Sequence, residues 1–506
     1  MTPSPTDNLA TVAGLEPAAV WTFFAGLANV PRPSKREAKV QQYIRDLAAS
    51  HGLGCREDAV GNLVLTADAT EGCDDAPVTV IQAHLDMVCE KNSGVDFDFD
   101  HDAIRLVRDQ DGEGADVLRA DGTTLGADNG LGVALALAAA TAPGIRRGPL
   151  EILLTFDEES GMTGALNLDP AVVEGRRLLN LDSEDNALYI GCAGGTDVEL
   201  SWQLETAAVA NDAPRARISV SGLRGGHSGC DIHEGRGNAN KLLVRALRRS
   251  SIDGLRLLSI DGGNLRNAIP REASALVAVP SATDIETLTQ VARDVEAEAR
   301  RESLEPGAEV RVEAATDEGG TVAVTAADTH RLLDALAALP HGVLGMHPEI
   351  PTLVETSSNL ASVRSTPTDG GLRIEAVKLS RGSSASRMAE ALDRIAAIGA
   401  LSGAEVATAN GYPGWEPNPS SPLLATFRQV HQELFGDLPE VKAIHAGLEC
   451  GILGERLGDL DMISFGPRIE GAHSPDERVW IGSVERCWRY LVAVLDALAE
   501  TDRNPS

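Results

Sequence analysis

The first part of the chain alternates short apolar runs with stretches of helical periodicity. This alternation continues to about residue 191 and predicts a largely parallel sheet covered by helices on both faces. The expected helices span residues 16–27, 35–49 and 133–140, and the expected strands span residues 78–85, 152–156 and 178–181.

A second part, from residue 193 to residue 405, mixes longer helices with β-branched strands and predicts an α+β insertion long enough for two small units. Its strands are expected near residues 216–220, 255–260, 273–279, 309–314, 352–356 and 372–379, and its helices near 238–249, 284–301, 328–339 and 386–401. The first pattern then returns, with helices at 423–435 and 484–499 and a strand at 462–465. We therefore expect one α/β domain, residues 1–192 and 406–506, interrupted by a second domain, residues 193–405.

Composition narrows the classes of function. The 75 acidic residues outnumber the 44 basic ones and give a formal net charge of -31, so the basic surface that nucleic acid requires is missing. Residues 1–20 lack the basic and apolar regions of a signal peptide, and no apolar run is long enough to span a bilayer. The seven cysteines are scattered, as is typical of reduced thiols. We expect a cytoplasmic protein without a membrane or nucleic-acid partner.

Acidic and imidazole side chains follow several of the predicted strands. His84 and Asp86 end one apolar run, and because they lie two apart in a strand they project to the same side. Such a carboxylate can orient an imidazole that binds a metal. Taken alone, this pair is more often a polar strand end. Open α/β sheets bind ligands at the carboxyl ends of their strands, which favours a site.

Asp128 lies in a glycine-rich turn before the apolar helix. A turn of this kind can be a phosphate nest, but its glycine spacing matches no nucleotide-binding motif and it lacks the P-loop lysine. An acidic side chain there repels phosphate and suits a cation. We therefore interpret Asp128 as a metal ligand.

The remaining candidates are carboxylates after two further strands and a late histidine: Glu158, Glu159, Asp182 and His473. In so acidic a chain each of them alone describes a solvated loop. Together with His84 and Asp128 they provide the ligands for two zinc ions that share one carboxylate, while a neighbouring glutamate acts as general base.

At these residues the chain resembles the cocatalytic di-zinc exopeptidases, and more closely the aminoacyl-histidine dipeptidases, also called Xaa-His dipeptidases. The resemblance covers nearly the whole chain and is carried by the motifs Pro31-Arg-Pro-Ser34, Ala83-His-Leu-Asp-Met-Val88, Asp121-Gly-Thr-Thr-Leu-Gly-Ala-Asp-Asn-Gly130, Asp157-Glu-Glu159, Gly225-Gly-His-Ser-Gly229, Gly237-Asn-Ala-Asn-Lys241, Asn267-Ala-Ile-Pro270, Ile444-His-Ala-Gly-Leu-Glu-Cys-Gly451 and Ala472-His-Ser-Pro475.

The resemblance implies roles for the metal-site residues. His84, Asp128 and Asp182 would bind one zinc ion, and Asp128, Glu159 and His473 would bind the other. Asp86 would orient His84, and Glu158 would deprotonate the attacking water. Manganese or cobalt would be able to replace zinc.

It also implies an aminopeptidase-like catalytic domain with a lid domain of two ferredoxin-like units. In the lid, His227 would polarise the scissile carbonyl, Asn267 would place the substrate and Arg381 would receive its terminal carboxylate. The backbone of Gly447 would line the site. An ordinary turn, an Asx turn and a surface charge are the alternatives for the three lid side chains. Ser358 and Ala361 depart from the usual family residues.

These expectations describe a metal-dependent dipeptidase that cleaves unblocked dipeptides, Xaa-His among them. The alternatives are an N-acyl amino acid amidohydrolase with the same metals and arginine, and a non-catalytic peptide- or metal-binding protein. A binding protein would have lost a ligand or the base, and all are present. The second domain supplies its residues within one chain, or two chains exchange them as symmetric dimers can, and we expect a homodimer.

Overall fold

The computed structural model describes residues 5–315 and 320–501, and these residues form two compact units. The first unit combines the described residues 5–191, 415–443 and 448–501, and the second combines residues 192–315, 320–414 and 444–447. The second unit therefore extends past the predicted boundary at residue 405. Its strand β21 (Glu405–Tyr412) pairs with β9 (Gly194–Leu204). The sequence pattern predicted neither of these strands.

The first unit is built on an eight-stranded sheet in the order β1-β2-β6-β3-β7-β23-β8-β22. These strands are β1 (Gly54–Glu57), β2 (Leu63–Ala67), β3 (Thr79–His84), β6 (Leu150–Thr155), β7 (Arg177–Asn180), β8 (Leu188–Cys192), β22 (Val441–Ile444) and β23 (Asp461–Ser464). The central strands β6, β3, β7 and β23 are parallel, whereas β1, β2 and β8 pair antiparallel. The predicted α/β class is confirmed, and the sheet is parallel at its centre only.

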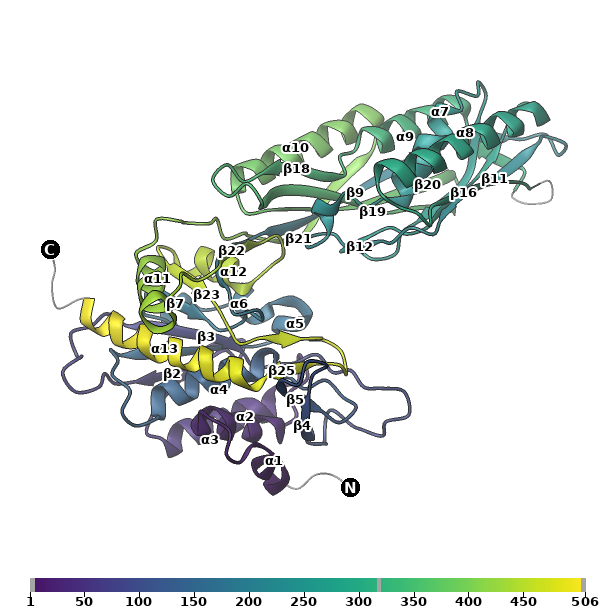
Figure 1. Ribbon diagram of the computed structural model, residues 1–506. Helices are drawn as coiled ribbons and strands as arrows, with labels where there is room; N and C mark the ends of the chain where they lie inside the picture. Colours follow the sequence, from purple (N-terminus) through teal and green to yellow (C-terminus); the bar gives the residue numbers. More distant parts are fainter. Residues whose placement is uncertain (1–4, 316–319, 502–506) are drawn as a thin grey trace. The chain divides into compact units, whose positions relative to one another are not determined.

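Helices and a small sheet complete this unit (Figure 1). The helices are α1 (Pro5–Val12), α2 (Ala18–Ala28), α3 (Ala38–Ser50), α4 (Ala127–Thr141), α5 (Glu158–Gly161), α6 (Thr163–Leu166), α11 (Pro422–Phe435), α12 (Glu449–Leu457) and α13 (Ile481–Thr501), with a 3-10 turn at Pro170–Val172. The unpredicted strands β4 (Leu106–Gln110), β5 (Asp116–Ala120), β24 (Ile469–Glu470) and β25 (Arg478–Trp480) form a four-stranded sheet. Helix α4 packs between the strands β3 and β6 and the helix α2, and its residues are therefore apolar on all sides.

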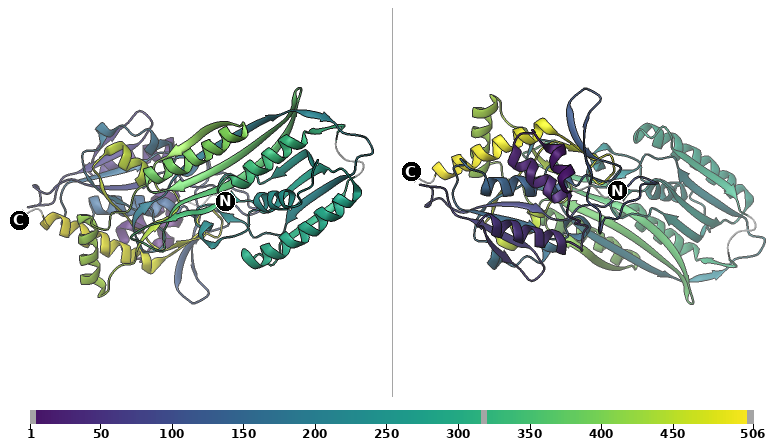
Figure 2. Two further views of the ribbon diagram at one scale, coloured as in Figure 1. Left: turned by 90° about the horizontal axis from the view of Figure 1, so that it is seen from above. Right: turned by 90° about the horizontal axis from the view of Figure 1, so that it is seen from below.

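The second unit contains a nine-stranded sheet with its helices along one face (Figure 1). Its other elements are β10 (Thr206–Ala208), β11 (Arg215–Ser221), β12 (Gly226–His227), a 3-10 turn (Ile232–Glu234), α7 (Ala239–Arg249), β13 (Arg256–Gly262), β14 (Ala268–Ile269), β15 (Ala273–Ala278), α8 (Ala282–Glu302), β16 (Glu309–Ala314), β17 (Val322–Val324), α9 (Ala326–Ala338), β18 (Gly342–Met346), β19 (Val354–Thr368), β20 (Gly371–Gly382) and α10 (Ala385–Ser402). Seen from above, the teal and green helices lie in front of the strands (Figure 2).

Two βαββαβ units make up this sheet, as predicted. The strand order β16-β11-β15-β13 belongs to one unit and β19-β20-β9-β21 belongs to the other. Strands β13 and β19 join them through the pairs Asp261 with Arg364 and Gly262 with Val363. The second of these units is discontinuous, since its first strand, β9, precedes the whole of the other unit in sequence.

The first and the second compact unit each have their own apolar core, so each can hold functional side chains in fixed positions. Among the helices of the described residues, none is both long and apolar enough to cross a membrane.

Candidate functional site

The carboxyl ends of three adjacent strands carry the first set of candidate residues. His84 is the last residue of β3, Glu158 and Glu159 follow β6, and Asp182 follows β7. Because β6, β3 and β7 are parallel neighbours, their ends meet at one edge of the sheet. Asp128 is added by the first turn of α4 and His473 by the loop after β24.

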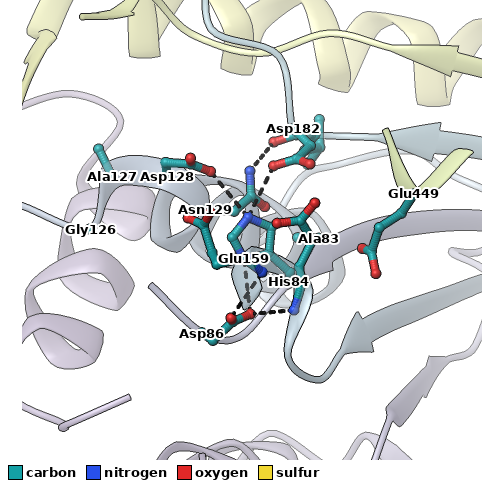
Figure 3. A network of polar contacts seen from close by, with 12 residues as sticks. Ala83, His84, Asp86, Gly126, Ala127, Asp128, Asn129, Glu159, Asp182 and Glu449 are labelled. Atoms are coloured by element: carbon teal, nitrogen blue, oxygen red, sulfur yellow. Dashed lines mark hydrogen bonds and ion pairs between the residues drawn. The ribbon is translucent and has the colours of Figure 1, made fainter. Parts of the chain in front are cut away.

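Asp128 faces both histidines (Figure 3 shows its contact with His84). Its Oδ1 lies 3.1 Å from Nε2 of His84, and its Oδ2 lies 3.1 Å from Nε2 of His473. His84 Nε2 is also 3.3 Å from Asp182 Oδ1, and His473 Nε2 is 3.1 Å from Glu159 Oε2. The structure therefore brings all the predicted metal-site residues together in two groups that share Asp128.

Each of these two groups is compact enough for a metal ion. One is formed by His84, Asp128 and Asp182 and the other by Asp128, Glu159 and His473, and within each group the ligand atoms lie within 4.8 Å of one another. His84, Glu158 and Glu159 also satisfy this distance. The distances therefore do not distinguish Glu158, the predicted base, from the predicted metal ligands.

Asp86 joins the end of β3 to the turn after β6. Its Oδ1 lies 3.3 Å from Nδ1 of His84 and accepts a hydrogen bond of 3.0 Å from the backbone N–H of Glu158. Its Oδ2 accepts from the backbone N–H of Glu159 at 3.2 Å and from the Ser34 hydroxyl at 2.7 Å. Asp86 is fully buried, so it is placed to orient the His84 ring, and it holds the backbone of the two glutamates.

Crowding of carboxylates shifts the pKa values of this region. Burial raises the pKa of Asp182 to about 6, against the attraction of His84 and with repulsion from Asp128 and Glu159. Burial, together with Asp182, Glu449 and Glu159, raises the pKa of Glu158 well above its usual range. The pKa of His473 rises to about 11, because Asp128 and Glu159 accept hydrogen bonds from its ring. The group holds more negative charge than its two imidazoles can neutralise.

Glu449 is a buried acid that the sequence patterns did not single out, although it lies within the motif 444–451. It begins α12, and its Oε2 accepts hydrogen bonds from the Gln82 amide at 2.7 Å and from the Thr155 hydroxyl at 2.6 Å. Burial raises its pKa to about 7. Arg32, within the motif 31–34, and Glu477, two residues after the motif 472–475, likewise contact the segments that carry the metal-site residues.

In the second unit, His227 is held in one tautomer. It lies on β12, and its Nδ1 accepts backbone hydrogen bonds from Gly229 at 3.3 Å and Cys230 at 3.0 Å. An acceptor at Nδ1 leaves the ring proton on Nε2, which makes Nε2 a hydrogen-bond donor. Burial lowers the pKa of His227, and the nearby charge of Arg381 lowers it further, so the ring is neutral at neutral pH.

Arg381, on β20, is a buried guanidinium without a carboxylate partner. Only 5% of the residue is exposed, its Nη1 donates to the Tyr412 hydroxyl at 2.8 Å, and it forms no ion pair within the described parts of the chain. Its Nε has no hydrogen-bond partner there either. The sequence analysis did not predict this contact of Tyr412. The Tyr412 ring packs directly over Gly195, where an added Cβ would lie 2.8 Å from the ring.

The other predicted residues of the second unit are less tightly placed. The backbone carbonyl of Asn267 accepts a hydrogen bond of 2.8 Å from the N–H of Ser228, beside His227, but its side chain is exposed. Gly447 follows the buried His445, whose Nε2 lies 2.7 Å from the Ser357 hydroxyl. Ser358 and Ala361 are buried on β19, so their departure from the usual residues affects packing inside this unit.

An α/β sheet that ends in two carboxylate–imidazole groups is the architecture of a metal-dependent hydrolase. Residues 80–497 match peptidase family M20/M25/M40. The chain belongs to this family, and it is therefore a metallopeptidase that uses divalent metal ions.

Two relatives match over nearly their whole lengths. The chain is 37% identical to the cytosol non-specific dipeptidase of Escherichia coli over 489 residues, which covers 96% of this chain and 99% of that protein. It is 39% identical to a solved aminoacylhistidine dipeptidase from Vibrio alginolyticus, with a TM-score of 0.87 over 96% of this chain and 98% of that one. A tripeptidase structure from Staphylococcus aureus shares the fold at 14% identity, with a TM-score of 0.59. The resemblance inferred from the motifs and the predicted class of enzyme are confirmed.

Proposed function

We propose that this protein is a dipeptidase that hydrolyses dipeptides with free amino and carboxyl ends, Xaa-His dipeptides among them. The observation that carries the proposal is the sharing of Asp128 between two imidazole–carboxylate groups. The names of the two full-length relatives, both dipeptidases, support the choice of substrate. The name of the Escherichia coli relative also supports a cytosolic location. The homodimer stays a prediction.

The donor set fits two divalent metal ions. Imidazole nitrogens and carboxylate oxygens are the donors that zinc prefers, and here each Nε2 faces two carboxylate oxygens although a ring nitrogen carries at most one proton. Cations would remove the repulsion among the buried carboxylates. We assign His84, Asp128 and Asp182 to one ion and Asp128, Glu159 and His473 to the other, with zinc as the expected metal and manganese or cobalt as substitutes.

Bound metal ions would polarise the peptide carbonyl and make the attacking water more acidic. Glu158 takes the proton from that water and delivers it to the leaving amine. The raised pKa of Glu158, caused chiefly by burial, supports this assignment, because a carboxylate that takes up a proton and then returns it needs a higher proton affinity than an exposed one. Asp86 holds the backbone of Glu158 and thereby aims the carboxylate.

Side chains of the second unit act on the substrate. His227 donates its Nε2–H to the carbonyl oxygen as negative charge develops there, which the backbone hydrogen bonds to Nδ1 support. Arg381 binds the terminal carboxylate, because a buried guanidinium with a free Nε offers that anion its missing partner. Asn267 and the backbone of Gly447 complete the substrate contacts.

Three matched substrates test the proposal: Ala-His, N-acetyl-histidine and the amide of Ala-His. The protein is stripped with a chelator and then restored with zinc, manganese or cobalt. We expect metal-restored cleavage of Ala-His, with slow or no cleavage of the other two. Cleavage of N-acetyl-histidine alone would make the protein an amidohydrolase, and turnover of none of them with any metal would favour a binding protein.

A further inference from the structure

Two buried charged side chains outside the metal set hold the backbone that carries it. We propose that Glu477 and Arg32 are positioning residues that fix Asp128 between the two metal sites before any metal binds. This inference rests on the metal assignment made above. It concerns the backbone turn at residues 125–128, whose N–H groups bond to Glu477 and whose carbonyl at Gly126 bonds to Arg32.

Glu477 binds four successive backbone N–H groups of this turn. Its Oε2 accepts from Leu125 at 2.7 Å and from Gly126 at 2.9 Å, and its Oε1 accepts from Ala127 at 2.7 Å and from Asp128 at 3.2 Å. Only 2% of Glu477 is exposed, so water does not replace these bonds. Consecutive N–H groups that converge in this way form a nest for an anion. The anion here is a side chain of the protein itself.

The conformation of the turn depends on glycine. Gly126 has a φ of 68°, in the left-handed region that other residues rarely adopt. A Cβ on Gly126 would lie 2.5 Å from Nη2 of Arg32, and a Cβ on Gly130 would lie 2.6 Å from the same atom. The glycines therefore give the turn its shape and admit the guanidinium against it.

Arg32 holds the same turn through its carbonyl side. Its Nη2 donates to the carbonyl of Gly126, and its Nη1 donates to the carbonyls of Leu85 and Asp86 at 3.0 Å each. Only 3% of Arg32 is exposed. The residue after His84 is thereby linked to the residue two before Asp128. Arg32 compensates the charge of Glu477, the carboxylate that attracts it most strongly.

The contacts of Glu477 and Arg32 join segments that carry predicted metal ligands. Glu477 lies four residues after His473, in a turn closed by the hydrogen bond of 3.1 Å from its N–H to the carbonyl of Ser474. Three segments are thus tied together: the end of β3 with His84, the turn with Asp128 and the loop with His473. Without metal the carboxylates at this edge repel one another. The two positioning residues hold Asp128 in place against that repulsion.

The test measures metal affinity in the full-length protein without substrate. We expect Glu477→Gln to weaken zinc binding by roughly 10- to 100-fold, as loss of a residue behind a metal ligand typically does. A glutamine offers one acceptor oxygen, and its amide N–H₂ faces donors. Affinity is read by competition with a chromophoric chelator. Glu477→Asp, which keeps the charge, should recover part of the affinity.

Glu151→Gln is the matched control. Glu151 is also buried in the first unit, contacts Arg56, and accepts backbone hydrogen bonds of 2.9 Å from Glu174 and Gly175, which carry no metal-site residue. Equal zinc affinity in both glutamine variants would overturn the proposal. If Glu477→Gln does not fold, Arg32→Lys replaces it, with a loss of about tenfold expected and an unchanged affinity as the contradicting result. Failure of the wild type to bind zinc would contradict the proposed function instead.

Discussion

Around the candidate metal site the first unit gathers buried carboxylates about two imidazoles, whereas around Arg381 the second unit places a buried guanidinium beside neutral imidazoles. In the first unit burial raises the pKa values of Glu158, Glu449 and Asp182, so each of these groups resists carrying its negative charge. Cations at this edge of the sheet would relieve that cost. The metal-free unit is therefore electrostatically incomplete.

The second unit shows the opposite arrangement. Arg381 lacks an ion-pair partner among the described residues, and the nearby His227 and His445 are neutral because burial lowers their pKa values, that of His445 to about 3. Lys378, on the same strand as Arg381, is fully buried, and burial lowers its pKa well below the usual range. The proposed role of Arg381 in binding an anion agrees with this arrangement.

The comparison assigns the two charges of the reaction to different parts of the chain. In the proposed function, metal ions would balance the charge of the first unit, and the terminal carboxylate of a dipeptide would balance that of Arg381 in the second. Substitutions in one unit should therefore change metal binding or the chemical step, whereas substitutions in the other should change substrate affinity. Each side of this division can be tested separately.

Glu158→Gln should have the largest effect. Removal of a general base typically costs 10²- to 10⁴-fold, so we expect kcat for Ala-His to fall by about 10³-fold. Zinc affinity should stay close to that of the wild type. The adjacent variant Glu159→Gln is the control, because loss of a ligand should weaken zinc binding instead. Near wild-type turnover by Glu158→Gln would remove the base from the proposed mechanism.

Arg381→Met should act on substrate binding. Loss of one partner of a buried charge pair costs roughly 2–5 kcal/mol, so we expect KM for Ala-His to rise by about 100-fold, with no change in zinc affinity. The control is Arg373→Met on the same strand, because Arg373 is exposed and pairs with Glu375. Equal losses on Ala-His and on its amide would contradict a carboxylate receptor.

Four of the five predicted metal ligands carry a local signal in the sequence, since His84, Glu159 and Asp182 follow apolar runs and Asp128 lies in a glycine-rich turn, whereas His473 is a loop histidine. The ends of β6, β3 and β7 come together whenever these strands are parallel neighbours, so His84, Glu159 and Asp182 could be grouped without coordinates. Asp128 was predicted as a ligand because an acidic side chain in that turn repels phosphate and suits a cation. Each signal is weak alone, and the prediction rested on their joint occurrence together with one topological rule.

Other features depend on contacts that no local pattern encodes. The role of Glu477 arises from backbone N–H groups some 350 positions away in the chain, and backbone donors leave no mark on residue type. Tyr412 contacts Arg381 because β21 and β20 both pair with β9. Strand β9 itself is separated from β20 by an entire inserted unit. The second unit extends past the predicted boundary at residue 405 for the same reason.

The two units should respond oppositely to acid when the metal is removed. The pKa of Glu449 is raised to about 7, so the stability it contributes is full below its unfolded value and is lost as pH rises through 7. The pKa values of His341 and His445 are lowered to about 3, so their contribution is full above about pH 6.5 and is lost as pH falls toward 3. From pH 8 to pH 5, local stability should rise in the first unit and fall in the second.

Hydrogen exchange with mass spectrometry reads each unit separately, after correction for the pH dependence of intrinsic exchange. Glu449→Gln should flatten the response of the first unit, and His445→Gln should flatten that of the second. Responses of the same sign in both units would contradict the opposite burial of charge.

Tyr412→Phe should have the smallest effect and should sharpen the comparison within the second unit. The variant removes the hydroxyl that accepts from Nη1 of Arg381 but keeps the ring that packs over Gly195. A hydrogen bond to a charged group that only orients it should contribute about 1 kcal/mol, so we expect KM for Ala-His to rise roughly fivefold with kcat unchanged. The amide of Ala-His should show no change, since it has no carboxylate for Arg381 to bind. Tyr189→Phe, which removes a hydroxyl bonded to Asp185 in the first unit, provides the control. If KM is unchanged in Tyr412→Phe, the hydroxyl does not orient Arg381. The pairing of β20 with β9 would then be enough to set the direction of the guanidinium.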